Sequence, residues 1–253
     1  MLIDSHCHLY ATEFETDLPA VMQRAQDAGV RRFYLPAIDS STTEAMLKLE
    51  ASYPGTCICM AGLHPCSVKA DYIQELELVN QLLSQRQFAA IGEIGLDFYW
   101  DKTFLQEQYD AFNKQIELAI SYNLPIVIHT REAMTETLEV VKNYKGKVKG
   151  IFHCFGGSPE EANQIIELGF LMGIGGVITY KNSGLAETLK HIDLKNIVLE
   201  TDAPYLTPVP FRGKRNESSY LKYVQEKIAL IKEVDIEEVA AVTTANALGM
   251  FAF

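Results

Sequence analysis

The sequence predicts an α/β fold, namely a closed (β/α)8 TIM barrel that forms a single domain over residues 1–253. First, short apolar runs alternate with longer amphipathic segments, which is typical of a parallel sheet whose strands are joined by helices. Second, this alternation occurs eight times, and barrels of this kind commonly take up about 250 residues. Third, no interior stretch has the composition of a linker, a low-complexity tract or a block of like charges.

The expected strands are short, and some of them are apolar on both faces, as in Ile126-Val127-Ile128. Strands with two apolar faces are typical of a parallel sheet that is covered on both sides. In chain order, the eight predicted strands are Met1–Asp4, Arg32–Ala37, Cys57–Gly62, Ala89–Glu93, Pro125–His129, Gly150–His153, Phe170–Ile174 and Ile197–Glu200.

Several helices are expected from their capping residues. Ser158 is a predicted N-cap, because Pro159 follows at the first helical position and Glu161 completes a capping box. The same spacing predicts helix starts at Ser41 with Glu44 and at Asp235 with Glu238. Between Phe104 and Ile120, apolar residues recur at the helical period and predict a helix with one buried face.

An open, doubly wound sheet that binds a dinucleotide is the main competing fold. Its first βα turn would be rich in glycine, but here that turn reads Asp4-Ser5-His6-Cys7-His8. Gly173-Ile174-Gly175-Gly176 lacks the full dinucleotide fingerprint, so we interpret it as a tight turn at a strand end.

Composition limits the classes of function. A net charge of −11 argues against a surface that coats nucleic acid broadly, although a local phosphate pocket is still compatible with it. The beginning of the chain does not resemble a signal peptide, and no stretch is apolar enough to span a membrane, so a cytoplasmic location is expected. The five cysteines show no framework spacing and are expected to be free thiols.

Six polar side chains follow or end predicted strands, at the edge where barrel enzymes build their sites. His6 and His8 are two residues apart, so both imidazoles point the same way in an extended segment. Glu93 has two carboxylate oxygens and is able to bridge two cations about 3.5–4 Å apart. The sequence therefore predicts a site for two divalent cations, of Mg, Mn, Zn, Co or Fe, with the ligands His6, His8, Glu93, His129, His153 and Asp202.

The competing interpretation treats each of these residues separately. A single histidine at a strand end is more often a hydrogen-bonded core residue, and a single carboxylate there often caps the next helix. Five of the chain's six histidines, however, lie at strand ends that a barrel would bring together, and only His191 lies elsewhere. Such a concentration favours a metal centre over coincidence.

Substrate contacts are predicted at three further residues, His64, Arg131 and Arg212. The arginine side chains match phosphate oxygens with a planar fork of donors. Purely structural roles, in the core for His64 and in solvated loops for the arginines, are the alternatives. Lys214 and Arg215 add positive charge next to Arg212.

Six motifs in order resemble the TatD family of metal-dependent deoxyribonucleases over nearly the whole chain. They are Ile3-Asp4-Ser5-His6-Cys7-His8-Leu9, Gly62-Leu63-His64-Pro65, Ala90-Ile91-Gly92-Glu93-Ile94-Gly95-Leu96-Asp97, Pro125-Ile126-Val127-Ile128-His129-Thr130-Arg131, His153-Cys154-Phe155-Gly156-Gly157 and Leu199-Glu200-Thr201-Asp202-Ala203-Pro204-Tyr205-Leu206. The resemblance implies a TIM barrel of the amidohydrolase-like superfamily, divalent metals, and hydrolysis of DNA phosphodiesters, commonly from the 3′ end. The family's ligands fall on the same six residues. Ser218 stands where the family usually has a proline, and Glu93 where many amidohydrolases have a modified lysine.

The expected reaction is attack of water on phosphorus, in which Asp202 orients the water and accepts its proton and Glu93 joins the two cations. The expected partner is DNA, held by a few phosphates at a single-stranded or frayed end. Three alternatives remain open, namely a small-molecule amidohydrolase, a non-catalytic metal-binding protein, and an enzyme that acts on aminoacylated or damaged RNA ends.

Overall fold

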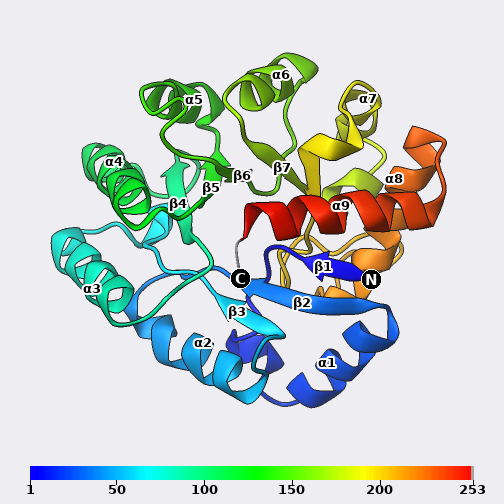
Figure 1. Ribbon diagram of the computed structural model, residues 1–253, viewed down its shortest axis with the longest axis horizontal. Coiled ribbons are helices and arrows are strands. Elements are labelled where there is room, and N and C mark those ends of the chain that lie inside the picture. Colours follow the sequence, from blue (N-terminus) through cyan, green and yellow to red (C-terminus); the bar gives the residue numbers. More distant parts are fainter. Residues whose placement is uncertain (252–253) are drawn as a thin grey trace.

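The computed structural model describes residues 1–251 and shows the predicted barrel. Its eight strands are all parallel and form two hydrogen-bonded sets, β1-β2-β3 and β4-β5-β6-β7-β8 (Figure 1). The strands are β1 (Leu2–Asp4), β2 (Val30–Leu35), β3 (Cys57–Cys59), β4 (Ile91–Asp97), β5 (Ile126–Arg131), β6 (Gly150–Phe152), β7 (Leu171–Ile174) and β8 (Ile197–Leu199). All eight predicted strands are confirmed in order, with shifts at their ends.

Backbone hydrogen bonds join the two sets of strands into a closed ring. Between β3 and β4, the amide of Gly92 donates to the carbonyl of Ala61 at 2.9 Å. Between β8 and β1, the amide of Ser5 donates to Leu199 at 3.0 Å, and the amide of Asp202 donates to His6 at 2.9 Å. The segments around His6 and Asp202 therefore lie side by side although they are almost 200 residues apart in sequence.

The buried carboxylate of Asp4 reinforces this closure from the end of β1. Its Oδ1 accepts a hydrogen bond from the amide of Thr201 at 3.0 Å, and its Oδ2 accepts one from the hydroxyl of Thr201 at 2.6 Å. The hydroxyl of Ser218 donates to the same Oδ2 at 2.6 Å. Burial raises the pKa of Asp4 to about 6 although these donors act in the opposite direction. The first strand is thus tied to the segment that follows the last one.

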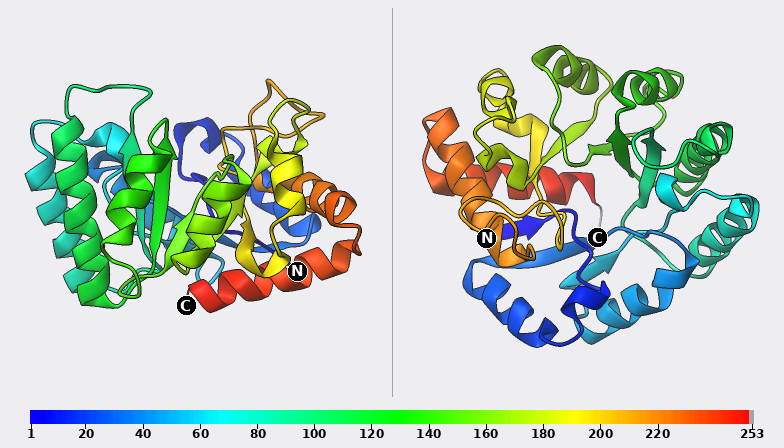
Figure 2. Two further views of the ribbon diagram at one scale, coloured as in Figure 1. Left: turned by 90° about the horizontal axis from the view of Figure 1, so that it is seen from above. Right: turned by 180° about the vertical axis from the view of Figure 1, so that it is seen from behind.

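Helices surround the sheet and one helix covers an end of the barrel (Figures 1 and 2). They are α1 (Leu18–Asp27), α2 (Ser40–Ser52), α3 (Tyr72–Gln85), α4 (Leu105–Tyr122), α5 (Met134–Lys142), α6 (Pro159–Glu167), α7 (Leu185–Lys190), α8 (Leu221–Lys232) and α9 (Ile236–Met250). The side chains of Thr244 and Asn246 on α9 donate to the carbonyls of Met1 and Ile197, where β1 and β8 begin. Helix α9 therefore closes the amino-terminal end, and the carboxyl ends of the strands stay free of it.

Two of the three predicted caps are placed correctly. Ser158 makes the full capping box with Glu161 at the start of α6, and α9 begins after Asp235, whose side chain makes no capping bond. The prediction of a cap at Ser41 is wrong, because Asp39 caps α2. Asp39 Oδ1 accepts from the amide of Ser41 at 3.1 Å, so the carboxylate takes the capping role and the helix starts earlier.

The end of the fourth strand is also predicted incorrectly. Its expected last residue was Glu93, but β4 continues to Asp97 and places Glu93 in its interior. The register against β5 shifts between Gly92 and Ile94, at the position of Glu93. The two strands approach so closely beyond it that a Cβ on Gly95 would lie 2.0 Å from the carbonyl oxygen of His129. A residue without a Cβ is therefore required at Gly95.

Within residues 1–251 no helix is both long and apolar enough to cross a membrane. The five cysteines are free, and Cys7, Cys57 and Cys59 are buried.

Candidate metal centre

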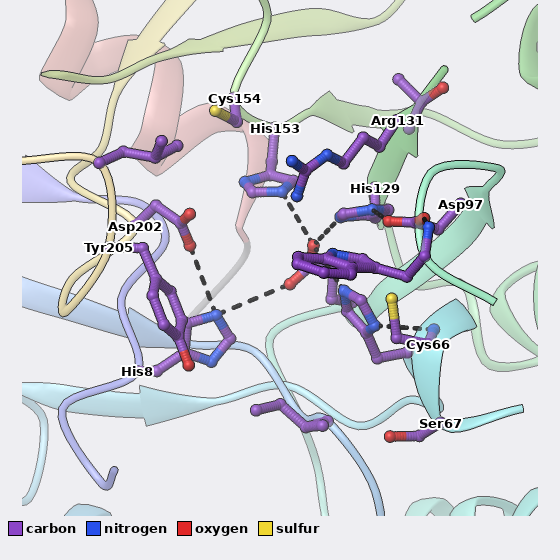
Figure 3. Close-up of a pocket in the computed structure, with 16 residues that line it drawn as sticks. His8, Cys66, Ser67, Asp97, His129, Arg131, His153, Cys154, Asp202 and Tyr205 are labelled. Carbon is purple, nitrogen blue, oxygen red and sulfur yellow. Dashed lines mark hydrogen bonds and ion pairs between the residues drawn. The ribbon is translucent and has the colours of Figure 1, made fainter. Parts of the chain in front are cut away.

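A cavity of about 720 Å³ opens at the carboxyl ends of the strands (Figure 3). Glu93 and four of the histidines that we selected from the sequence line it, and so do Asp202 and Tyr205. His6 lies deeper and has no exposed surface. The barrel therefore brings all six predicted ligands, together with His64, into one cluster.

Glu93 is at the middle of this cluster and is almost fully buried. Its Oε2 lies 3.1 Å from His6 Nε2 and 3.7 Å from His8 Nε2. Its Oε1 lies 2.8 Å from His129 Nδ1 and 2.8 Å from His153 Nε2. Each carboxylate oxygen thus faces a different pair of imidazole nitrogens.

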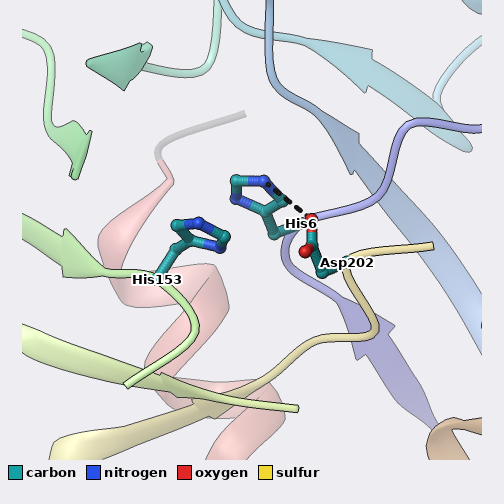
Figure 4. A group of neighbouring side chains, drawn as sticks. All are labelled: His6, His153 and Asp202. Carbon is teal, nitrogen blue, oxygen red and sulfur yellow. Dashed lines mark ion pairs between the residues drawn. The ribbon is translucent and has the colours of Figure 1, made fainter. Parts of the chain in front are cut away.

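Asp202 joins the side formed by His6 and His8. Its Oδ1 lies 3.7 Å from His6 Nε2 and 3.5 Å from His8 Nε2. Figure 4 shows the Asp202 carboxylate directed at His6, with the ring of His153 next to that of His6. These two rings are stacked with their centroids 3.9 Å apart.

Three buried groups behind the imidazoles were missed by the sequence analysis. Tyr10 Oη lies 2.9 Å from His8 Nδ1, Asp97 Oδ2 lies 2.9 Å from His129 Nε2, and Glu200 Oε1 lies 3.4 Å from His153 Nδ1. Groups of this kind behind metal-binding histidines fix the orientation of the ring. A signal was available in the sequence, because residues an even number of positions apart in an extended segment point the same way. Each of the three missed residues is an even number of positions from a predicted ligand, namely Tyr10 from His8, Asp97 from Glu93 and Glu200 from Asp202.

The hydrogen bond of Tyr10 determines the tautomer of His8. The single hydroxyl proton of Tyr10 is donated to the carbonyl of Pro36 at 2.6 Å, so its oxygen accepts a hydrogen bond from His8 Nδ1–H. In the neutral ring this leaves a lone pair on Nε2, the atom that faces Glu93 and Asp202. His8 is thus prepared to donate to a cation.

His64 has the opposite arrangement. Its Nδ1 accepts a hydrogen bond from the backbone N–H of Cys66 at 3.0 Å. A neutral ring then carries its proton on Nε2, which lies 3.4 Å from Glu93 Oε1. His64 therefore offers the cavity a hydrogen-bond donor and no lone pair, although its distance from Glu93 alone would also allow metal binding.

The residues present fit divalent cations. Neither ring nitrogen of the fully buried His6 makes an aligned hydrogen bond, and an unsatisfied buried imidazole is costly unless another group binds it. Imidazole nitrogens together with carboxylate oxygens suit zinc, manganese, iron or cobalt. Among residues 1–251, three overlapping sets have donor atoms within 4.8 Å of one another, namely His6 with His153 and Asp202, His6 with His8 and Glu93, and His64 with Glu93 and His129.

Electrostatics in the cluster favour charged carboxylates. Burial by itself raises the pKa of Glu93, but the surrounding imidazoles, that of His153 foremost, hold it well below its usual value. Burial lowers the pKa of His6. Burial by itself also lowers the pKa of His153, but the carboxylates of Glu93 and Glu200 outweigh it and raise the pKa of that ring. Cations that bind between these groups would displace protons from the imidazoles.

The predicted phosphate-binding cations are in different positions. Arg131 lines the cavity (Figure 3). Its guanidinium lies 3.8 Å from the ring centroid of Tyr99. Arg212 is exposed, lies 4.1 Å from the ring centroid of Tyr180, and is outside the set of residues that line the cavity. Arg215 makes two hydrogen bonds of 2.8 Å to Asp17 and so serves the structure of its loop.

The loop that contains these last arginines is held by Asn216. Its side-chain amide donates to the carbonyls of Thr201 at 2.8 Å and Tyr205 at 2.6 Å. The loop is therefore attached to the segment that carries Asp202.

Similar proteins match almost the whole chain. The sequence model of a family described as "TatD related DNase" matches residues 3–252. The uncharacterized metal-dependent hydrolase YabD of Bacillus subtilis (strain 168) is 40% identical over 253 residues, which cover 99% of each chain. The 3'-5' ssDNA/RNA exonuclease TatD of Erwinia tasmaniensis is 32% identical over 257 residues, again 99% of each chain. The crystal structure of the TatD homolog YjjV from Escherichia coli K12 has a TM-score of 0.93 and 29% identity, covering 100% of this chain and 98% of that one.

Proposed function

Because this chain belongs to the TatD family of metal-dependent hydrolases, we propose that it hydrolyses phosphodiester bonds of DNA, in the 3′ to 5′ direction, at single-stranded or frayed ends. The relative from Erwinia tasmaniensis is named as an exonuclease of single-stranded DNA and RNA, which supports a single-stranded substrate. We also propose that residues 1–253 act as one domain, because the main core cluster contains residues from Leu2 to Ala240.

The position of Glu93 carries the proposal. One of its oxygens faces His6 and His8, and the other faces His129 and His153, as a carboxylate between two cations must. One cation would be held by His6, His8, Glu93 and Asp202, and the other by Glu93, His129 and His153. Bound there, divalent cations would supply an acidified water and neutralise charge on the phosphate.

Residues of the chain supply the remaining functions. Asp202 accepts the proton of the attacking water, since it lines the cavity and its carboxylate lies beside both His6 and His8. His64 donates from Nε2 to a phosphate oxygen, and Arg131 pairs with a phosphate from the wall of the cavity. Arg212 contacts the strand farther out. The net charge of −11 limits the number of phosphates engaged.

Digestion of end-labelled strands tests this function. The chelator-treated protein is expected to be inactive, and each metal is added back in turn with single-stranded DNA, blunt duplex, closed circular duplex and single-stranded RNA. Activity should require the metal, shorten the labelled strand from its 3′ end, and be fastest on the single strand. Glu93→Gln should abolish it, whereas the exposed control Glu117→Gln should not.

Three results would contradict the proposal. Rapid cutting of the closed circle would exclude attack at ends. Turnover of an amide substrate with no phosphodiester cleavage would indicate a small-molecule amidohydrolase, and tight metal binding with neither activity would indicate a binding protein.

A further inference from the structure

Trp100 is an exposed aromatic residue at the mouth of the catalytic cavity. It is the only tryptophan of the chain, 65% of it is exposed, and it lines the same cavity as Glu93 and His129. An indole ring exposed to water presents a large apolar surface, and exposed apolar surface beside polar groups commonly marks a binding site.

The loop that carries Trp100 is held in place by several interactions. Asp97 Oδ1 accepts hydrogen bonds from the backbone N–H groups of Tyr99 and Trp100, both at 3.0 Å. On the far side of Trp100, Asp101 forms an ion pair of 2.8 Å with Lys69. The ring of Tyr99 meets that of Trp100 edge-on, with centroids 4.8 Å apart. The indole is therefore exposed on a fixed loop, which lowers the entropy cost of binding a ligand against it.

The same carboxylate that holds this loop also holds the metal centre. While Oδ1 of Asp97 binds the backbone of the loop, its Oδ2 lies 2.9 Å from His129 Nε2. The backbone N–H of Asp97 donates a hydrogen bond to Gln108 Oε1 at 2.9 Å, which helps to keep the carboxylate in place. The position of Trp100 is thereby set relative to His129 and Glu93.

A cation completes the arrangement. The guanidinium of Arg131 lies over Tyr99 and is 5.2 Å from the centroid of the Trp100 ring. These groups match the parts of a nucleotide chain: the aromatic face suits a base, the guanidinium suits a phosphate, and the metal centre suits the scissile phosphate.

We propose that Trp100 is a stacking platform for a nucleobase next to the scissile bond, and that it makes this enzyme prefer unpaired, base-bearing ends of any sequence. The proposal rests on the phosphodiesterase function above. Every base has a π face, so stacking of this kind tolerates sequence, and a base within a duplex is already stacked and not available.

Binding of two matched strands to the metal-loaded protein tests the proposal. One is a short oligothymidylate with phosphorothioate links that resist cleavage, and the other has the same links but abasic residues at its 3′ end. The oligothymidylate should quench Trp100 fluorescence and bind roughly 5- to 150-fold more tightly than the abasic strand. Affinities of the variants are measured by the anisotropy of a 5′ label. Trp100→Ala should lose the preference for the oligothymidylate while its affinity for the abasic strand stays the same, and Trp100→Phe should keep most of the preference. Tyr122→Ala, an exposed aromatic residue remote from the cavity, is the control.

The outcomes separate this inference from the function on which it rests. Cleavage of DNA together with equal affinity for the two strands would overturn the stacking role and leave the nuclease standing. An equal loss of affinity for both strands in Trp100→Ala would also overturn the stacking role, because such a loss would show that Trp100 acts on the structure or on the phosphates. A base-dependent preference in a protein that cleaves no phosphodiester would support the platform and refute the nuclease.

Discussion

Replacing Tyr10 by phenylalanine tests whether the hydroxyl behind His8 prepares that ring for a cation. The ring of Tyr10 is buried, so the substitution keeps the packing and removes only the oxygen that accepts from His8 Nδ1 and donates to Pro36. Without it, nothing in the pair selects the tautomer that leaves a lone pair on Nε2.

Two separate effects are expected, one on metal binding and one on folding stability. Loss of a group behind a ligand typically weakens metal binding about 10- to 100-fold, or about 1.4–2.7 kcal/mol. The carbonyl of Pro36 also loses its donor, which costs about 1–3 kcal/mol of folding stability when the group is buried. In a chain of this size each kcal/mol lowers Tm by about 2–4 °C.

Calorimetric titration of the chelator-treated protein with Mn²⁺ or Zn²⁺ measures the first effect, and thermal unfolding in chelator measures the second. Only one of two binding steps should weaken, because His8 lies on the Oε2 side of Glu93 and His129 on the other side. Tyr34→Phe is the matched control, since this buried tyrosine stacks on Phe251 in a separate core cluster. A lower Tm with both binding constants unchanged would refute the reasoning about the tautomer and leave Tyr10 a purely structural residue.

Three further outcomes are expected. Asp202→Asn should lower single-turnover cleavage by at least about 10²-fold and leave the circular dichroism spectrum unchanged, and a variant that keeps a tenth of the rate would exclude proton acceptance by this residue. Arg131→Ala should make the dependence of log affinity for single-stranded DNA on log salt shallower by about 0.7, whereas Arg31→Ala, at the start of β2, should leave that slope as it is. Burial raises the pKa of Cys57 and of Cys66 to about 12, so the native protein should react slowly with an aromatic disulfide reagent at pH 8. In the unfolded protein all five thiols should react quickly, and several fast-reacting thiols in the native protein would contradict this burial.

Much of the fold could be predicted from sequence because each strand of a parallel barrel is a short apolar run between helices. The order of the strands, the start of α6 at Ser158 and the convergence of the polar residues all follow from local patterns. The position of Glu93 within β4 could not be predicted, since it depends on how closely β4 packs against β5 at Gly95. Contacts between one strand and its neighbour in the sheet leave no trace in the local period of the sequence.

The distinction between ligands and their neighbours was also beyond sequence. His64 and His8 both stand near a strand end, and only the hydrogen bonds to Cys66 and Tyr10 show which ring nitrogen carries the proton. Likewise, Arg131 and Arg215 look equivalent in the sequence as cations near strand ends, but in the structure Arg215 is bound by Asp17. Partners of this kind are set by the tertiary fold.

The closure of the ring by Asp4, Thr201 and Ser218 has a consequence for synthesis on the ribosome. Glu93, His129 and His153 come from consecutive strands of one sheet, so that half of the centre is able to assemble while the rest of the chain is still being made. The other half combines β1 with the segment after β8 and has to wait until Ser218 has left the exit tunnel. A polypeptide that ends before residue 202 therefore lacks Asp202 and is unable to complete the cluster.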